Sequence, residues 1–338
     1  MPCEGEMRVP EIVLRCVLYL GNATDNGTFN AKGTGFIVDV ERSDGIPAHY
    51  LVTADHVRRG LRDDKNFAIR INDAEGKAQL LRSPRAFKWW RHPSDKSVDA
   101  AIYPWSLRDY PFASFPMERF VTERQLQQTK STQGIGIGDE IFIVGLFRKM
   151  AGRARITPIV RTGHIAMKAS EPILTKNYGE ARLHLVEAFS TAGLSGSPVF
   201  VHETVYFPYY DMEMQKQSVA MTLGKTHLLG LLHGTIPIET IVELAGAVSD
   251  PNQKWHSGIS MVVPSEQLLE IFNQPGLIEY EKKVDRALKD NKPIESSIPD
   301  DNRSGKPKRR TRDVGIPPIS REKFFGALKK ATRKRDKK

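Results

Sequence analysis

Short apolar stretches separated by turn residues recur along the chain from residue 11 to residue 263. Most are rich in β-branched and aromatic residues, and Gly, Asn, Asp or Pro stands between them. Many short strands at close spacing are typical of an all-β barrel or sandwich. The pattern predicts strands at 11–20, 36–40, 49–53, 66–71, 78–81, 140–146, 155–161, 163–168, 182–187, 198–202, 227–233 and 258–263. The strands 66–71 and 78–81 are expected to form a hairpin around Glu75-Gly76.

The period of the apolar positions changes after residue 264. In residues 265–272 the apolar side chains recur at helical spacing, with Leu268, Leu269 and Phe272 on one face. Ser265 stands where a helix N-cap is expected. The sequence therefore predicts a short helix that closes the β-rich part of the chain.

The last part of the chain has a different composition. Residues 291–319 are rich in Pro, Ser, Asp and Lys, which favours a disordered linker. In residues 320–335 apolar positions recur at helical spacing among Lys and Arg, which predicts a short amphipathic helix. We therefore divide the chain into a folded domain, 1–275, and a basic extension, 276–338.

The net charge of +10 belongs to this extension. Residues 301–338 contain 15 Lys and Arg against 4 Asp and Glu, a net charge of +11, so the rest of the chain has a net charge of −1. Such a segment suits a docking helix for a protein partner, a contact with a polyanion such as nucleic acid, or a weak membrane-surface anchor. A solvated basic tail without a partner is the fourth alternative.

One stretch has the composition of a nucleophile on a tight turn. Residues 190–200 read Ser-Thr-Ala-Gly-Leu-Ser-Gly-Ser-Pro-Val-Phe, so small residues surround Ser195 and an apolar strand follows. Glycines let consecutive N–H groups point at one spot, where they can hold an oxyanion. The N–H groups of Gly193 and Ser195 are the candidates for that role. An ordinary turn before a strand is the alternative.

A nucleophilic serine needs a base, and the base needs an orienting carboxylate. His56 follows the apolar run 50–54, and Asp99 opens the apolar run 100–102. Asp55 adjoins the histidine, but neighbours on an extended strand face opposite ways. Asp95 also competes with Asp99; the resemblance described next favours Asp99, because the apolar run 100–102 after it matches that family's pattern at the catalytic aspartate.

The order His56, Asp99, Ser195, with Gly33-Thr-Gly-Phe36 ahead of the histidine, resembles the trypsin-like (chymotrypsin-fold) serine peptidases. The likeness is greatest to the bacterial HtrA-like and glutamyl-endopeptidase-like branches, without a PDZ domain. It implies two six-stranded β-barrels, at about 10–120 and 134–263, with the site between them and the helix 265–272 after them.

The resemblance also implies a reaction. His56 takes the proton of Ser195 as Ser195 attacks a peptide carbonyl, Asp99 orients the imidazole, and water hydrolyses the acyl-enzyme. This chemistry needs no cofactor. No histidine shows a zinc-ligand spacing, so we expect no metal.

The substrate pocket implied by the resemblance is lined by residues before the nucleophile and by two later strands. Phe189, Ser190, Gly234 and Gly258 occupy those positions. The absence of an acid at 189 argues against cleavage after Arg or Lys, and we expect a small or apolar P1 residue. Glutamyl endopeptidases place a histidine in the strand that matches 229–234. Alignment on Gly230 puts Leu232 at that position and His233 one residue late, so cleavage after Glu stays an alternative.

Three other features change details of the picture. Leu194 stands where proteolytically activated relatives carry an acid, so we expect no zymogen of that kind. Residues 202–226 form a long insertion between two strands, a candidate gate or a surface loop. The glycines of 134–138 lack the spacing of a dinucleotide-binding loop.

Two cysteines are few for a secreted protein of this size, and the N-terminus, Met1-Pro-Cys-Glu-Gly-Glu, lacks the basic segment followed by an apolar one that is typical of a signal peptide. No apolar run is long enough for a membrane span. We therefore expect a cytoplasmic serine endopeptidase acting on peptides or proteins. The alternative is a catalytically silent protease-fold protein that binds peptides or partners, with the basic tail docking to a partner or to nucleic acid.

Overall fold

The computed structural model describes residues 9–23, 28–41, 45, 47–61, 67–73, 75–82, 88–105, 112–127, 133–147, 152, 154–175, 179–190, 193–209, 217–237 and 256–289. The chain divides into two units, Met1–Leu277 and Ile278–Lys338. The predicted linker 291–319 and helix 320–335 lie outside the described residues.

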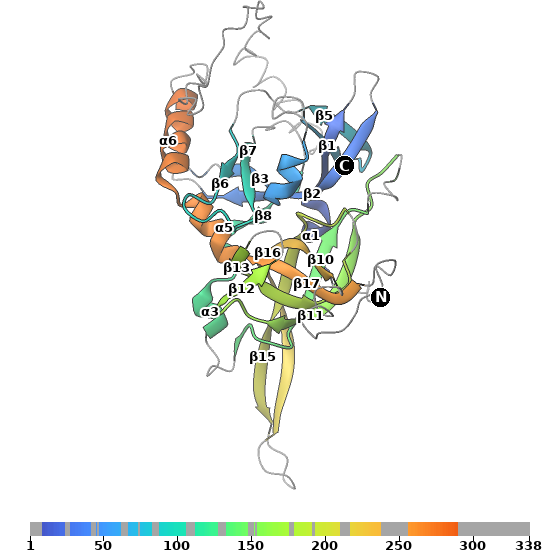
Figure 1. The fold of residues 1–338 in the computed structure, drawn as a ribbon, viewed down its shortest axis with the longest axis vertical. Coiled ribbons are helices and arrows are strands. Elements are labelled where there is room, and N and C mark those ends of the chain that lie inside the picture. The colour runs from blue at the N-terminus through green and yellow to red at the C-terminus, as the bar shows by residue number, and fades with distance from the viewer. Residues whose placement is uncertain are drawn as a thin grey trace, which may run out of the picture. The chain divides into compact units, whose positions relative to one another are not determined.

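The first half of the larger unit is an antiparallel sheet with the strand order β5-β4-β1-β2-β3-β7-β6 (Figure 1). A short strand, β8, pairs in parallel with β2. The strands are β1 (Val17–Ala23), β2 (Phe29–Val40), β3 (Ala48–Thr53), β4 (Phe67–Asn72), β5 (Ala78–Arg82), β6 (Trp90–Arg91), β7 (Ala101–Trp105) and β8 (Phe115–Pro116). The predicted hairpin formed by 66–71 and 78–81 is confirmed as β4 and β5, with Gly76 in the left-handed region at φ +77°.

The start of this sheet differs from the prediction of one strand over 11–20. Residues Glu11–Arg15 form a helical turn, α1, and the strand begins at Val17. Cys16 lies between them and is fully buried, with its Sγ 3.5 Å from the carbonyl oxygen of Val13. Burial raises the pKa of this thiol to about 12, although its own backbone N–H acts in the opposite direction.

The second half is a closed barrel of six antiparallel strands, β10-β11-β14-β17-β16-β15. Closure comes from β15 pairing back to β10, with Phe142 opposite Phe200. The strands are β10 (Glu140–Gly145), β11 (Ile159–Met167), β14 (His184–Glu187), β15 (Pro198–Tyr209), β16 (Gln217–Pro237) and β17 (His256–Pro264). Strand β9 (Gln133–Gly134) pairs with β15, and β12 (Pro172–Thr175) and β13 (Gly179–Arg182) form a separate hairpin.

Two predictions about this barrel are corrected. The two strands expected at 155–161 and 163–168 are one continuous strand, β11, because Gly163 pairs with Ile141 in regular register. The segment 202–226, expected as a loop, continues β15 and β16 as a two-stranded ribbon out to the pair Tyr209–Gln217 (Figure 1). Its β-branched and aromatic residues favour extended backbone.

Apolar residues from every strand of the barrel fill its interior, as alternation along a strand requires. This core contains Ile141, Ile143, Ile165, Val186, Leu194, Val199, Val201, Leu229, Leu232 and Val262. Leu232, considered at the sequence level for the pocket, therefore belongs to the core.

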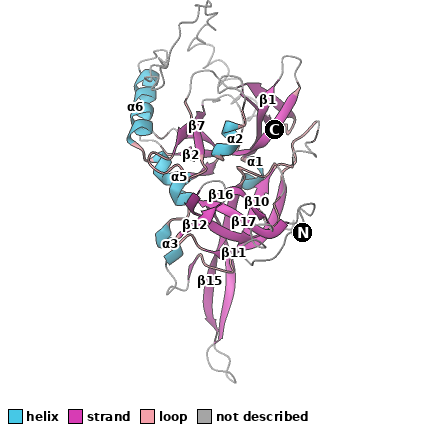
Figure 2. Cartoon of the chain, in the orientation of Figure 1, coloured by secondary structure: helices cyan, strands magenta, loops and turns pink. Residues whose placement is uncertain are grey.

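Short helices connect the sheets or follow them (Figure 2). They are α2 (Asp55–Arg59), the 3₁₀ turn η1 (Met117–Arg119), α3 (Glu123–Gln127), α5 (Ser265–Phe272) and α6 (Pro275–Lys289). The bounds of α5 confirm the predicted helix 265–272. Its N-cap is Pro264, without a side-chain cap, and the Ser265 hydroxyl instead donates to the carbonyl of Val121 at 2.6 Å, so the predicted role of Ser265 is wrong.

The architecture is all-β, a chymotrypsin-like pair of β-units followed by a helix, which confirms the predicted fold class. The six-strand count applies to the second barrel, whereas the path of the first sheet contains seven strands. Among the described helices, none has both the length and the apolar character needed to cross a membrane.

Candidate active site

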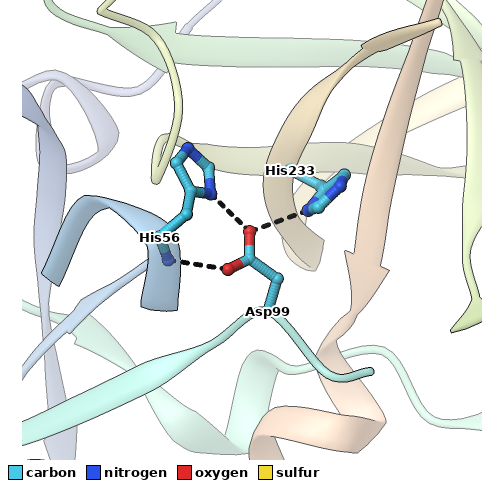
Figure 3. A group of neighbouring side chains, drawn as sticks. All are labelled: His56, Asp99 and His233. Atoms are coloured by element: carbon cyan, nitrogen blue, oxygen red, sulfur yellow. Dashed lines mark hydrogen bonds and ion pairs between the residues drawn. The ribbon is translucent and has the colours of Figure 1, made fainter. Parts of the chain in front are cut away.

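His56 and Asp99 come together within the first sheet. His56 is the second residue of α2, which begins directly after β3, and Asp99 lies just before β7, the neighbour of β3. The Asp99 Oδ1 accepts the backbone N–H of His56 at 2.8 Å, and its Oδ2 lies 2.6 Å from His56 Nδ1 (Figure 3). The same carboxylate therefore holds both the main chain and the ring of His56.

A second histidine contacts the same oxygen of Asp99. His233, from β16, places its Nδ1 2.7 Å from Asp99 Oδ2 (Figure 3). Burial of Asp99, which is 1% exposed, raises its pKa, but hydrogen bonds from His233 and His56 and their positive charge outweigh that effect. The pKa of Asp99 is consequently held well below its ordinary value, and the carboxylate is ionised at neutral pH.

The two competing aspartates lie elsewhere. Asp55 forms ion pairs with Arg58 and Arg59 of its own helix, at 2.6 and 3.2 Å. Asp95 is exposed and accepts the backbone N–H and the hydroxyl of Ser97, both at 2.7 Å. Neither contacts His56 in these interactions, so Asp99 is the carboxylate that the structure places against the histidine.

Ser195 lies on a tight turn before β15, as its glycines predict. Gly193 and Gly196 have φ values of +109° and +85°, a backbone region that disfavours other residues. The turn closes through Ser197 N–H to the carbonyl of Leu194 at 2.9 Å, and Gly196 N–H donates to Leu232 of β16 at 2.9 Å. The second barrel thereby fixes the turn from one side.

The first sheet holds the turn from the other side through Thr34, a buried residue of β2. Its N–H donates to the carbonyl of Ser195 at 3.0 Å, and its hydroxyl donates to the carbonyl of Gly193 at 2.9 Å. The hydroxyl also accepts the N–H of Leu146 at 3.2 Å. The Thr34 side chain of the first sheet thus connects to the turn of Ser195 and to the end of β10.

The contacts of two glycines place the turn beside α2. A Cβ on Gly33 would overlap the side chain of Val57 and lie 3.0 Å from the carbonyl oxygen of Ser195. A Cβ on Gly196 would lie 3.2 Å from the backbone nitrogen of Ala54, the N-cap of α2. Ser195 therefore neighbours the helix that carries His56, although in the described part of the chain no hydrogen bond joins their side chains. Such bonds often tighten only when substrate binds.

The predicted oxyanion donors are unused within the described structure. No backbone hydrogen bond to another described residue involves the N–H of Gly193 or of Ser195, whereas those of Gly196 and Ser197 are both bonded. Two amides of the turn thus stabilise the fold, and the other two can donate hydrogen bonds to a ligand oxygen.

The four predicted pocket residues lie on three neighbouring segments. Phe189 is 63% exposed, Ser190 is buried, and Ala188 between them and β14 donates its N–H to the carbonyl of Gly258 at 2.9 Å. A Cβ on Gly234 would meet open space, and one on Gly258, which has φ +78°, would lie 4.0 Å from the ring of Phe189. Gly258 therefore leaves room beside the exposed ring of Phe189, and the space at Gly234 is open.

No protein-family model matches the sequence. No curated protein matches it either. Among solved structures, the inactive form of the Rv3671c protease of M. tuberculosis is 14% identical with a TM-score of 0.40, over 78% of this chain and 89% of that chain. Deg5 is 15% identical with a TM-score of 0.38, over 69% and 88%. The HtrA-type protease AlgW with a decapeptide is 15% identical with a TM-score of 0.42, over 79% and 65%.

His233 is the contact that sequence reasoning missed. Alternation along 229–234 predicts which side chains face the barrel interior, but β16 has an irregularity in its pairing with β17 between Leu232 and Gly234. An extra residue at such a bulge changes the direction of a side chain. His233 lies at the bulge, and its Nδ1 contacts Asp99.

His56, Asp99 and His233 could together hold a metal ion, because one ligand atom from each lies within 4.8 Å of the others. Two ligands of a tetrahedral zinc stand roughly 3.3 Å apart, since each lies about 2.0–2.1 Å from the ion. The separations from Asp99 Oδ2 to the two ring nitrogens, 2.6 and 2.7 Å, are those of charge-assisted hydrogen bonds. The described geometry is that of a hydrogen-bonded group of three side chains.

Proposed function

We propose that the chain is a serine endopeptidase that hydrolyses peptide bonds through His56, Asp99 and Ser195. The observation that carries the proposal is that Asp99 bonds both the backbone N–H and the ring of His56. Beside this pair, a glycine turn positions Ser195 together with two backbone N–H groups that make no backbone hydrogen bond to another described residue. Because an ionised carboxylate only accepts hydrogen bonds, His56 carries its proton on Nδ1 and leaves Nε2 free as the base.

The reaction follows from this tautomer. His56 Nε2 takes the hydroxyl proton as Ser195 Oγ attacks the peptide carbonyl, and the N–H groups of Gly193 and Ser195 stabilise the oxyanion. The imidazolium then gives its proton to the departing amine. Water, deprotonated by His56, hydrolyses the acyl-enzyme.

For the P1 residue we propose a small or apolar side chain. The exposed ring of Phe189 and the open space at Gly234 offer an apolar surface, and position 189 carries no charge to pair with Arg or Lys. Gly234→Val should fill that space without a clash and lower kcat/KM for large apolar P1 residues about 10- to 100-fold relative to alanine. Equal losses for both substrates would overturn this assignment.

The activity is tested by labelling with a fluorophosphonate, which reacts with an activated serine, in wild type, Ser195→Ala and His56→Ala. We expect labelling of wild type alone, and cleavage of a mixed peptide library by the same protein. Ser170→Ala removes an exposed hydroxyl in the same barrel and should label like wild type. A folded wild-type protein that neither labels nor cleaves would favour the alternative, a protease-fold protein that binds peptides without hydrolysing them.

A further inference from the structure

His233 meets Asp99 from the opposite side to His56. The two rings stand nearly perpendicular, at 83°, with their centroids 5.9 Å apart. Both Nδ1 atoms reach Oδ2 of the carboxylate, and Oδ1 is occupied by the backbone N–H of His56 (Figure 3). Each carboxylate oxygen is therefore engaged, and the carboxylate cannot rotate without breaking at least one of these bonds.

The same contacts determine where each ring carries its proton. A ring nitrogen 2.6 or 2.7 Å from an ionised carboxylate oxygen must be the donor, because that oxygen has no proton to give. His233, like His56, thus carries a proton on Nδ1. Both imidazoles donate to the same carboxylate oxygen, and both stabilise its negative charge.

His233 and His56 belong to different halves of the molecule. His56 lies on α2 of the first half, whereas His233 lies on β16 of the closed barrel. The bulge at His233 directs its ring to Asp99, and the exposed fraction of that side chain is 9%, against 33% for His56. The barrel that carries Ser195 therefore also contacts the carboxylate that orients the base.

We propose that His233 is a positioning residue that fixes Asp99 from the side opposite His56 and tempers the basicity of His56 by sharing the carboxylate oxygen. This rests on the proposed function of the same site. With His233 in place, a second hydrogen bond partly compensates the negative charge of the carboxylate. Asp99 therefore stabilises the protonated form of His56 less strongly. Asp99 and His56 are the titratable groups that face the His233 ring in these contacts.

The test compares His233→Leu, which removes the donor, with His233→Asn, whose amide N–H can replace Nδ1–H. For His233→Leu we expect kcat to fall about 10- to 100-fold at unchanged KM, and the acid limb of the pH–rate profile to move to higher pH. His233→Asn should restore most of kcat and return the limb toward that of wild type. A loss of rate at every pH with an unmoved acid limb would mean a structural role only and would overturn the proposal.

A proton NMR measurement separates this inference from the proposed activity. Wild type should show two imidazole Nδ1–H signals downfield of the amide region, and His233→Asn should lose one of them. Two signals in a protein that fails the fluorophosphonate test would uphold the contact and refute the peptidase. An active protein with one signal that His233→Asn leaves unchanged would refute the role of His233, and this readout also decides if His233→Leu fails to fold.

Discussion

The first sheet and the closed barrel contribute to the candidate site in different ways. The first sheet brings His56 and Asp99 together by hydrogen bonds made within that sheet. The barrel brings Ser195, whose turn is bonded to Leu232, and His233, which contacts a residue of the first sheet. The barrel is closed through β10 and β15, whereas the described pairings of the first sheet end at β5 and β6.

The difference separates two requirements of the proposed chemistry. The base and its carboxylate are positioned locally, between adjacent strands of one sheet. Alignment of the nucleophile with that base depends on contacts between the two halves, above all those of Thr34 and His233. Substitutions within one half should therefore change either proton transfer or stability. Substitutions at the contacts between the two halves should change proton transfer and stability together.

The largest effect is expected inside the first sheet, from Asp99→Asn. The amide has one acceptor oxygen for three donors, so the His56 tautomer is no longer enforced and kcat should fall about 10⁴-fold. Asp95→Asn makes the same change in an exposed turn and should leave kcat within about twofold. Steady-state kinetics of the two variants decides the matter; a loss of less than about tenfold for Asp99→Asn would contradict the assignment.

Gly196→Ala should break the contact between the halves. The residue has φ +85°, and its Cβ would overlap the carbonyl oxygen of Thr34 and the hydroxyl of Thr53. We expect the free energy of unfolding to fall by about 4 kcal/mol in urea denaturation. Gly138→Ala is the matched control, because Gly138 also has positive φ, +91°, but open space around its Cβ, and should cost only about 1 kcal/mol. Equal costs would mean that the contact with Thr34 is unimportant.

His184 tests the barrel alone. The side chain is 2% exposed, and its Nδ1 accepts the N–H of Ala169 at 2.9 Å. Burial, and then the positive charge of Arg182 and Lys168, lowers the pKa of His184 to about 4. Between pH 6.5 and 4 the unfolded chain binds a proton here that the folded chain does not, so the free energy of unfolding should fall by about 3 kcal/mol over that interval.

The His184→Gln variant should lack this contribution, so its stability should vary less between pH 6.5 and 4 in urea denaturation. His164→Gln, an exposed position on the neighbouring strand β11, should keep the pH dependence of wild type. Identical pH profiles for wild type and His184→Gln would show that His184 is protonated in the folded barrel.

The smallest effect is expected from Thr34→Val, which keeps the shape of the side chain and removes its hydroxyl. The carbonyl of Gly193 and the N–H of Leu146 lose their partner, which should cost about 2 kcal/mol of stability. Because the turn of Ser195 is released on one side, kcat should fall about tenfold. Thr34→Ser retains the hydroxyl and should recover most of both; a Thr34→Ser protein as impaired as Thr34→Val would point to packing instead of hydrogen bonding.

Local patterns in the sequence predicted much of the fold. The helix 265–272 and the hairpin around Gly76 follow from spacing and turn residues, which act over a few positions. The same information misassigned Glu11–Arg15, because apolar β-branched residues also suit one helical turn. It also missed the continuation of β15 and β16 through 202–226, which depends on pairing between distant residues.

The residues of the candidate site show the same difference between local patterns and contacts with residues remote in sequence. His56, Asp99 and Ser195 were predicted from their immediate neighbours and from the family resemblance, and the structure brings the first two into contact. His233 was missed because its direction depends on a bulge in β16, and alternation along one strand does not reveal where a bulge falls. The cap predicted for Ser265 failed for a similar reason, since its partner, Val121, is remote in sequence.

The reactivity of the buried Cys16 thiol can report how often the first sheet opens locally. Thiol reagents attack the thiolate, and this sulfur is both fully buried and held in its protonated form. With Cys3 replaced by serine, Cys16 is the single thiol of the chain, and it can react only while the segment between α1 and β1 is open. The rate at which a reagent modifies it therefore reports how often the half of the molecule that carries His56 opens, under conditions in which the protein as a whole stays folded.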